Sequence, residues 1–302
     1  MKLKEIHSSD LTANCMRYVQ LRFEGKTRPV ATGALFRGLV CGEALRMMHE
    51  RVLHDAKAEE LALYSPLVTE AVALVRATLD KEGRKLSDAC ERDINETIND
   101  VGELCESYWR KWRSKFVKCE LLGCEVPVRW KYAPRYPEFA SHIDLLIRDE
   151  RGNLVFIDWK LREEAPTWQY LTRNMQFGCY YGACLEGKFL LSDGLTKEWK
   201  HIGEESRGVW LHCNHLAPFK RKTRCEDDRG MEQEFNKGDE RPNRMSWREV
   251  EYAPSTAIED IRGELMMRVK MMKKDLFPTN PDPIGCSLCE AEAFCSRFDM
   301  VL

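Results

Sequence analysis

The sequence lacks an apolar run long enough to cross a bilayer, and its first residues, MKLKEIHSSDL, lack the apolar core of a signal peptide. These absences favour a cytoplasmic (or nucleoid-associated) protein. Neither sign of charge dominates, because 47 Lys and Arg oppose 49 Asp and Glu, for a net charge of −2. The chain as a whole is therefore not a general polyanion binder, and any affinity for nucleic acid must come from a local basic surface. No internal repeat is visible, which excludes a repeat architecture.

What the chain does have is enough material for a core and many cysteines. Its 302 residues are 43% hydrophobic and 10% aromatic, enough for one large domain or two small ones. The 13 cysteines are an odd number. In a reducing compartment they do not form a disulfide framework, so they are buried small residues, metal ligands or reactive thiols.

The hydrophobic period changes along the chain. Apolar residues recur every three or four positions over 34–63 and 66–116, which predicts helices, and strands follow from about residue 119. The order of elements predicts an α/β fold with a helical lobe inserted before the sheet. We interpret residues 1–302 as one domain made of an N-terminal segment (1–33), the helical lobe (34–118), a core (119–219), an exposed polar insertion (220–250) and a C-terminal helix with a cysteine cluster (251–302).

Two acids lie in adjacent apolar stretches. Asp144 lies in SHIDLLI and Asp158 in LVFIDWK, and the sequence between them, RDERGN, predicts a tight turn. Antiparallel pairing would bring both carboxylates to one side of the sheet, and Lys160 would share a face with Asp158 because strand side chains alternate. The simpler alternative is an exposed Asp–Lys pair at a strand end.

Two carboxylates in a partly buried site repel each other, and a divalent cation relieves that repulsion. Oxygen ligands suit Mg²⁺ or Mn²⁺, which polarises a phosphoryl oxygen and lowers the pKa of a bound water. A nearby ammonium stabilises the charge that develops. The pattern therefore predicts hydrolysis of a phosphodiester.

The segment NMQFGCYYGAC, expected within a helix over 168–186, places Gln176 and Tyr180 four residues apart on one helix face. A packed tyrosine and a capping glutamine are the alternative. Together, Asp144, the Asp158-x-Lys160 strand end and this helix resemble the PD-(D/E)XK nuclease superfamily, and the Gln-x-x-x-Tyr helix is similar to that of its RecB-like branch.

The resemblance implies a restriction-endonuclease-like core, with a mixed central sheet flanked by helices. It also implies that the two acids bind the catalytic metal, that the lysine assists the water, and that the Gln/Tyr helix contacts DNA and supports the site. The family's early G-x-x-x-H helix corresponds to RGLVCGEALRMMHE, where Gly42 stands in place of the histidine. Glu43 is the substitute ligand that we expect, with His49 as the alternative. Glu125 resembles an acid before the hairpin, although a solvated strand-edge role is the simpler interpretation.

The C-terminal sequence GCSLCEAEAFCSRF contains Cys286, Cys289 and Cys295. Such spacing predicts a metal site, either tetrahedral zinc or an iron–sulfur cluster, with Cys15 as the fourth ligand. The resemblance to iron–sulfur nucleases, AddB-type helicase-nucleases and CRISPR-associated adaptation exonucleases, implies a 4Fe–4S cluster that joins the two ends of the chain.

Two stretches are basic. YWRKWRSKF (108–116) interleaves aromatic and basic residues as single-strand binders do, although a solvated helix face explains it equally, and FKRKTR (219–224) is more typical of a loop. We therefore expect a Mg²⁺- or Mn²⁺-dependent DNA nuclease, an exonuclease on single-stranded ends in recombination, repair, phage replication or CRISPR adaptation, with a helicase or recombination protein as a possible partner. The alternative is a catalytically decayed iron–sulfur protein that still binds nucleic acid.

Overall fold

The computed structural model of the chain describes residues 5–7, 30–31, 33–54, 64–87, 91, 94–161, 174–192, 196–203, 207–216, 246–251 and 256–273. The four cysteines predicted to bind a metal, Cys15, Cys286, Cys289 and Cys295, lie outside these residues. No helix among the described residues is long and apolar enough to span a membrane.

Helices surround one large sheet. The helical elements are α3 (Gly33–Met48), the π-helical turn η1 (His49–Leu53), α4 (Tyr64–Lys81), α6 (Ile94–Phe116), α8 (Met175–Glu186) and α9 (Thr256–Lys273). The strands are β1 (Glu5–His7), β2 (Val30–Ala31), β3 (Lys85–Leu86), β4 (Glu120–Trp130), β5 (Glu138–Arg148), β6 (Leu154–Leu161), β7 (Lys188–Ser192), β8 (Lys197–Lys200), β9 (Val209–Leu216) and β10 (Ser246–Glu251).

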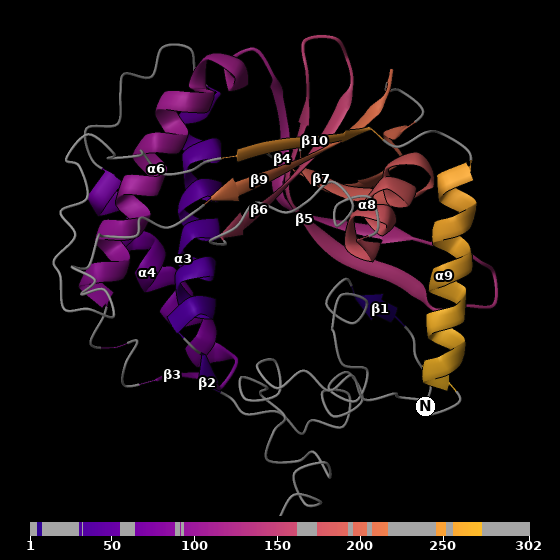
Figure 1. Cartoon of the computed structure of the whole chain (residues 1–302), viewed down its shortest axis with the longest axis horizontal. Coiled ribbons are helices and arrows are strands. Elements are labelled where there is room, and N and C mark those ends of the chain that lie inside the picture. Colours follow the sequence, from indigo (N-terminus) through magenta and orange to yellow (C-terminus); the bar gives the residue numbers. More distant parts are fainter. Residues whose placement is uncertain are drawn as a thin grey trace, which may run out of the picture.

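The sheet is mixed. Its eight strands run in the order β10-β9-β6-β5-β4-β7-β8, with β1 paired to β5. β6 is parallel to β9 and β1 is parallel to β5, whereas the other pairs are antiparallel. Helices α3, α4 and α6 lie on one side of the sheet, and α8 and α9 lie on the other (Figure 1). This α/β architecture is consistent with the predicted restriction-endonuclease-like core.

Each face of the sheet has its own hydrophobic core. On one face, α6 buries residues at spacings of three and four, including Val101, Leu104 and Tyr108, against Ile157 and Trp159 of β6. On the other, α8 approaches the sheet closely, since a Cβ added to Gly182 would lie 2.5 Å from the Trp130 ring. Because residue 182 is glycine and has no side chain, α8 can lie this close to β4.

The predicted strands and hairpin are confirmed, but two boundaries are wrong. The long helix expected over 66–116 is broken, because the chain turns at Gly83, whose φ of 69° suits glycine, and enters β3 before α6 begins. The polar insertion expected to reach residue 250 ends earlier, since residues 246–251 form β10 beside β9. Apolar and polar residues alternate only weakly in SWREVE. Pairing with β9, rather than the local sequence pattern, therefore makes these residues a strand.

Candidate active site

Three acids lie in a row across three adjacent strands. The β5–β6 ladder ends at the pair Leu145 and Ile157, and Asp144 and Asp158 are the next residues on the two strands, so continuing the register sets them opposite each other. Cys124 pairs with Leu145 in the same way on the other side, which places Glu125 opposite Asp144. The tight turn between β5 and β6 sets this register, so the two acids meet as the sequence predicts.

An interruption in strand pairing lies beside this row. One edge of β5 pairs with β1 at residues 138–140 and with β6 at residues 145–148, and residues 141–144 lie between the two ladders. Helix α8 reaches this interval, where the Tyr180 hydroxyl donates to the carbonyl of His142 at 2.7 Å. Asp144 thus sits where β5 and β6 separate, and side chains rather than a ladder complete the hydrogen bonding.

Asp158 is almost fully buried, at 1% exposure, and is held by two partners. The Lys160 ammonium lies 2.8 Å from Oδ1 and 2.7 Å from Oδ2 of Asp158. Gln176 Nε2 donates to Asp158 Oδ1 at 3.3 Å and to the Tyr180 hydroxyl at 2.9 Å. The four residues predicted from the strand end and the following helix therefore form one connected network.

The electrostatics favour a cation at the row of acids. Burial, together with the neighbouring Asp158 carboxylate, raises the pKa of Asp144 well above its ordinary value. Burial alone would lower the pKa of the Lys160 ammonium, but Asp158 and Asp144 outweigh it and raise that pKa. Lys160 therefore stays protonated at neutral pH. Its single positive charge is shared between the carboxyl groups of Asp158 and Asp144.

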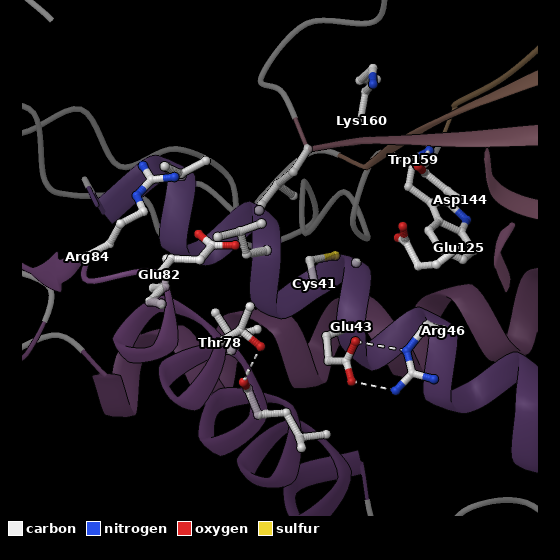
Figure 2. A pocket seen from close by; sticks show the side chains of 18 residues that line it. Cys41, Glu43, Arg46, Thr78, Glu82, Arg84, Glu125, Asp144, Trp159 and Lys160 are labelled. Atoms are coloured by element: carbon white, nitrogen blue, oxygen red, sulfur yellow. Dashed lines mark hydrogen bonds and ion pairs between the residues drawn. The ribbon is translucent and has the colours of Figure 1, made fainter. Parts of the chain in front are cut away.

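A cavity of about 840 Å³ opens beside Asp144, Glu125 and Lys160 (Figure 2). Asp144, Glu125 and Lys160 line one side of it, and α3 and α4 line the other. Figure 2 shows Glu43 on α3, bound through both carboxylate oxygens to Arg46, at 2.6 Å from Nη2 and 2.9 Å from Nε. Glu43, the expected substitute ligand, thus lines the cavity, but its carboxylate is paired with the Arg46 guanidinium, which also binds Glu50.

His49, the alternative to Glu43, lies elsewhere. It is 1% exposed, and its two ring nitrogens lie 3.0 Å from His54 Nε2 and 3.0 Å from the Tyr108 hydroxyl. Its ring packs against Phe116 at a centroid distance of 4.6 Å. A histidine with both nitrogens occupied inside an aromatic core is unsuited to bind a catalytic metal.

Two features of the site escape sequence reasoning. The backbone N–H of Trp159 donates to Asp144 Oδ2 at 2.8 Å, which orients that carboxylate. Glu125, expected to be an ordinary strand-edge acid, has a φ of 46° within β4, and loss of hydration followed by the charges of Glu43 and Asp158 raises its pKa. The sequence signal for Glu125 was its resemblance to the family's acid before the hairpin, and that for the Trp159 N–H was its position beside Asp158 and Lys160.

The donor set matches a hard divalent cation. Among the described residues, no group of three or more His, Cys, Asp and Glu side chains is arranged to hold a metal ion. Mg²⁺, however, is commonly bound through one or two carboxylates and completes its coordination with water and substrate oxygens. The opposed carboxylates of Asp144 and Asp158 supply that minimum.

Comparison with known proteins identifies a family. The model of the PD-(D/E)XK nuclease superfamily matches residues 16–296. No curated protein matches the sequence. A solved structure titled "Crystal structure of SSO0001" shares 12% identity, with 98% of this chain and 87% of that chain covered and a TM-score of 0.39, which is too low to support an argument.

Proposed function

The chain belongs to the PD-(D/E)XK nuclease superfamily, and on this premise we propose that it is a Mg²⁺- or Mn²⁺-dependent deoxyribonuclease that degrades single-stranded DNA from its ends. One observation carries the proposal. Asp144 and Asp158 oppose each other where β5 and β6 separate, with the Lys160 ammonium on the Asp158 carboxylate at 2.7 Å.

Each residue of the network has a distinct task. Asp144 and Asp158 would hold the cation, which when bound polarises the phosphodiester and lowers the pKa of an attacking water. Lys160, kept protonated by its acidic neighbours, stabilises negative charge that develops on the phosphoryl oxygens. Gln176 orients the Asp158 carboxylate, and Tyr180 ties α8 to β5.

The shape of the site supports a single strand as substrate. A cavity of about 840 Å³ lies within the roughly 300–1,000 Å³ range of small-ligand pockets, so it accommodates individual nucleotides better than an intact duplex. Helix α6 presents Arg110 and Lys111 with high exposure, and Lys111 also lies over the Trp112 ring at 5.0 Å. We propose that these cations contribute to a local basic surface for DNA phosphates, with Arg110 also paired to Glu106 of the same helix.

The proposal of an iron–sulfur cluster rests on the sequence alone. We propose that Cys15, Cys286, Cys289 and Cys295 bind a 4Fe–4S cluster that joins the chain ends within one domain. Alanine at any of the four should then give colourless, poorly folded protein, whereas Cys41→Ala should keep the colour. Iron and acid-labile sulfide per chain measure this, and a Cys15→Ala protein with full iron content would contradict the assignment.

The nuclease test uses anaerobically purified protein at neutral pH. Single strands labelled at the 5′ or 3′ end, and the matching duplex, are incubated with Mn²⁺, with Mg²⁺ or with EDTA. We expect metal-dependent shortening of single strands by the wild type and none by Asp158→Asn. Glu150→Gln, which removes one exposed carboxylate from the β5–β6 turn, is the matched control and should cut normally. Equal cutting by Asp158→Asn would refute the site.

A second candidate is a DNA-binding protein without catalysis, attached to a helicase or recombination partner. It is favoured by Gly42 in place of the family's histidine and by the lack of a three-ligand metal group among the described residues. Binding of labelled single strands without shortening in any metal would select this function over the first.

A further inference from the structure

A set of polar groups crosses the aromatic core between the helical lobe and β6. His49 is enclosed by Tyr108 and Phe116 of α6 and by Trp159, whose ring stacks on it at 5.6 Å and 27°. Placing an imidazole here is costly unless both of its nitrogens find partners. The partners extend in both directions from His49, to His54 on one side and toward β6 on the other.

The contacts form a continuous chain. Trp159 Nε1 lies 3.4 Å from the Tyr108 hydroxyl, which lies 3.0 Å from His49 Nε2. His49 Nδ1 lies 3.0 Å from His54 Nε2, and His54 Nδ1 lies 3.1 Å from the Cys119 carbonyl. The chain therefore joins the end of β6 to the start of β4 through the η1 turn and α6.

The two ends determine the direction of every bond. A carbonyl only accepts, so a neutral His54 must carry its proton on Nδ1 and accept at Nε2. His49 then donates from Nδ1 and accepts at Nε2 from the Tyr108 hydroxyl. The Tyr108 oxygen in turn accepts from the Trp159 indole, which can only donate. All the bonds point the same way, and both histidines are neutral with the proton on Nδ1.

This chain ends beside the row of acids. Trp159 lies between Asp158 and Lys160, its indole faces the helical lobe, and its backbone N–H holds Asp144 Oδ2 at 2.8 Å. The β5–β6 ladder ends two residues earlier on β6, at Ile157, so it does not set the distance between Trp159 and Asp144. The β6–β9 ladder, which runs through Trp159 to Leu161, holds this backbone from one side, and the anchored indole holds it from the side of the helical lobe.

We propose that His49, His54 and Tyr108 are positioning residues, which hold Trp159 through this directed hydrogen-bond chain and thereby orient Asp144 for cation binding. The inference rests on the proposed function only for the role of the cation. Groups that support metal ligands from outside typically change metal affinity by about 10- to 100-fold when they are removed.

The first test is spectroscopic and needs no variant to be active. Long-range proton–nitrogen correlation of ¹⁵N-histidine-labelled protein, without metal at pH 7.5, should show His49 and His54 neutral and protonated on Nδ1. His49→Gln and His54→Gln assign the signals. A proton on Nε2 of either ring would overturn the directed chain.

The second test removes one hydroxyl. Tyr108→Phe keeps the ring in the core but should weaken Mn²⁺ binding, measured by calorimetry, by roughly tenfold or more. If the protein cleaves DNA, the Tyr108→Phe substitution should lower kcat more than it raises KM. The matched control is Tyr132→Phe, which removes a buried hydroxyl from the opposite core and should leave Mn²⁺ affinity unchanged.

The outcomes separate the two proposals. Weaker Mn²⁺ binding by Tyr108→Phe in a protein that never cleaves DNA would support the positioning chain while refuting nuclease activity. Wild-type Mn²⁺ affinity and wild-type cleavage in Tyr108→Phe would refute the positioning role of the hydrogen-bond chain. The proposal of nuclease activity would still stand. Equal losses in Tyr108→Phe and Tyr132→Phe would also refute it, because any buried hydroxyl would then matter equally.

Discussion

The Asp144→Asn substitution removes one of two opposed carboxylates and keeps the shape of the side chain. The asparagine Oδ1 can still accept from the Trp159 N–H, so the local hydrogen bonding survives. What changes is the repulsion between the side chains at positions 144 and 158. The substitution should therefore stabilise the metal-free protein while it abolishes cleavage.

The register gives the magnitude. Directly opposed residues hold their Cβ atoms about 5 Å apart, and two unit charges at that distance repel by about 3 kcal/mol at an effective dielectric constant of about 20. Lys160 attracts Asp144 as well as Asp158, and losing that attraction offsets part of the gain. We expect a net stabilisation of about 1–2 kcal/mol, which raises Tm by about 2–3 °C in a domain of 302 residues.

The gain should depend on pH in a defined direction. The raised pKa of Asp144 means that the folded state binds its proton more tightly than the unfolded state does. Wild-type stability therefore falls as pH rises from the ordinary aspartate pKa, about 3.9, through the folded-state value. The advantage of Asp144→Asn should be largest at neutral and alkaline pH, and it should shrink as the solution is acidified.

Thermal unfolding in EDTA and in Mn²⁺ measures these effects. A cation at 100 times its dissociation constant adds about 2.7 kcal/mol to the wild type, and Asp144→Asn should gain much less. Glu150→Gln controls for the loss of one negative charge at an exposed position. An Asp144→Asn protein that melts below the wild type in EDTA, or gains as much from Mn²⁺, would refute the opposed-carboxylate reasoning.

Three further predictions concern the same region. Lys160→Met should abolish cleavage and lower Tm in EDTA, because the buried carboxylate beside it loses its ammonium; unchanged cleavage would contradict this. Tyr180→Phe leaves a β5 carbonyl without its donor, so urea denaturation should show a loss of about 1–3 kcal/mol. Burial lowers the pKa values of His49 and His54, so the folded state binds fewer protons than the unfolded state below about pH 6.5. Each histidine should therefore lower the free energy of unfolding by up to about 1.4 kcal/mol per pH unit as the pH drops below that value. Urea midpoints at pH 7.5 and 5.5 in the Asp144→Asn, Glu125→Gln background, where both carboxyl groups with raised pKa values are absent, test the last prediction, and equal midpoints would contradict it.

Local pattern was sufficient for the elements that carry the site. Apolar runs on both sides of a tight turn determined the β5–β6 hairpin, and the length of that turn determined that Asp144 and Asp158 oppose each other. A spacing of four placed Gln176 and Tyr180 on one helix face, where they bond to each other. These relations span few residues, so the sequence alone specified them.

Contacts between distant segments were decided only by the tertiary structure. Pairing with β9 makes a strand of the polar residues 246–251, and the separation of β5 from β6 lets the Trp159 N–H reach Asp144. His49 lies in an aromatic core rather than at the acids because α3 and η1 pack on α6, fifty or more residues away. Burial and partner choice at such positions depend on packing across the whole fold, and no local spacing encodes them.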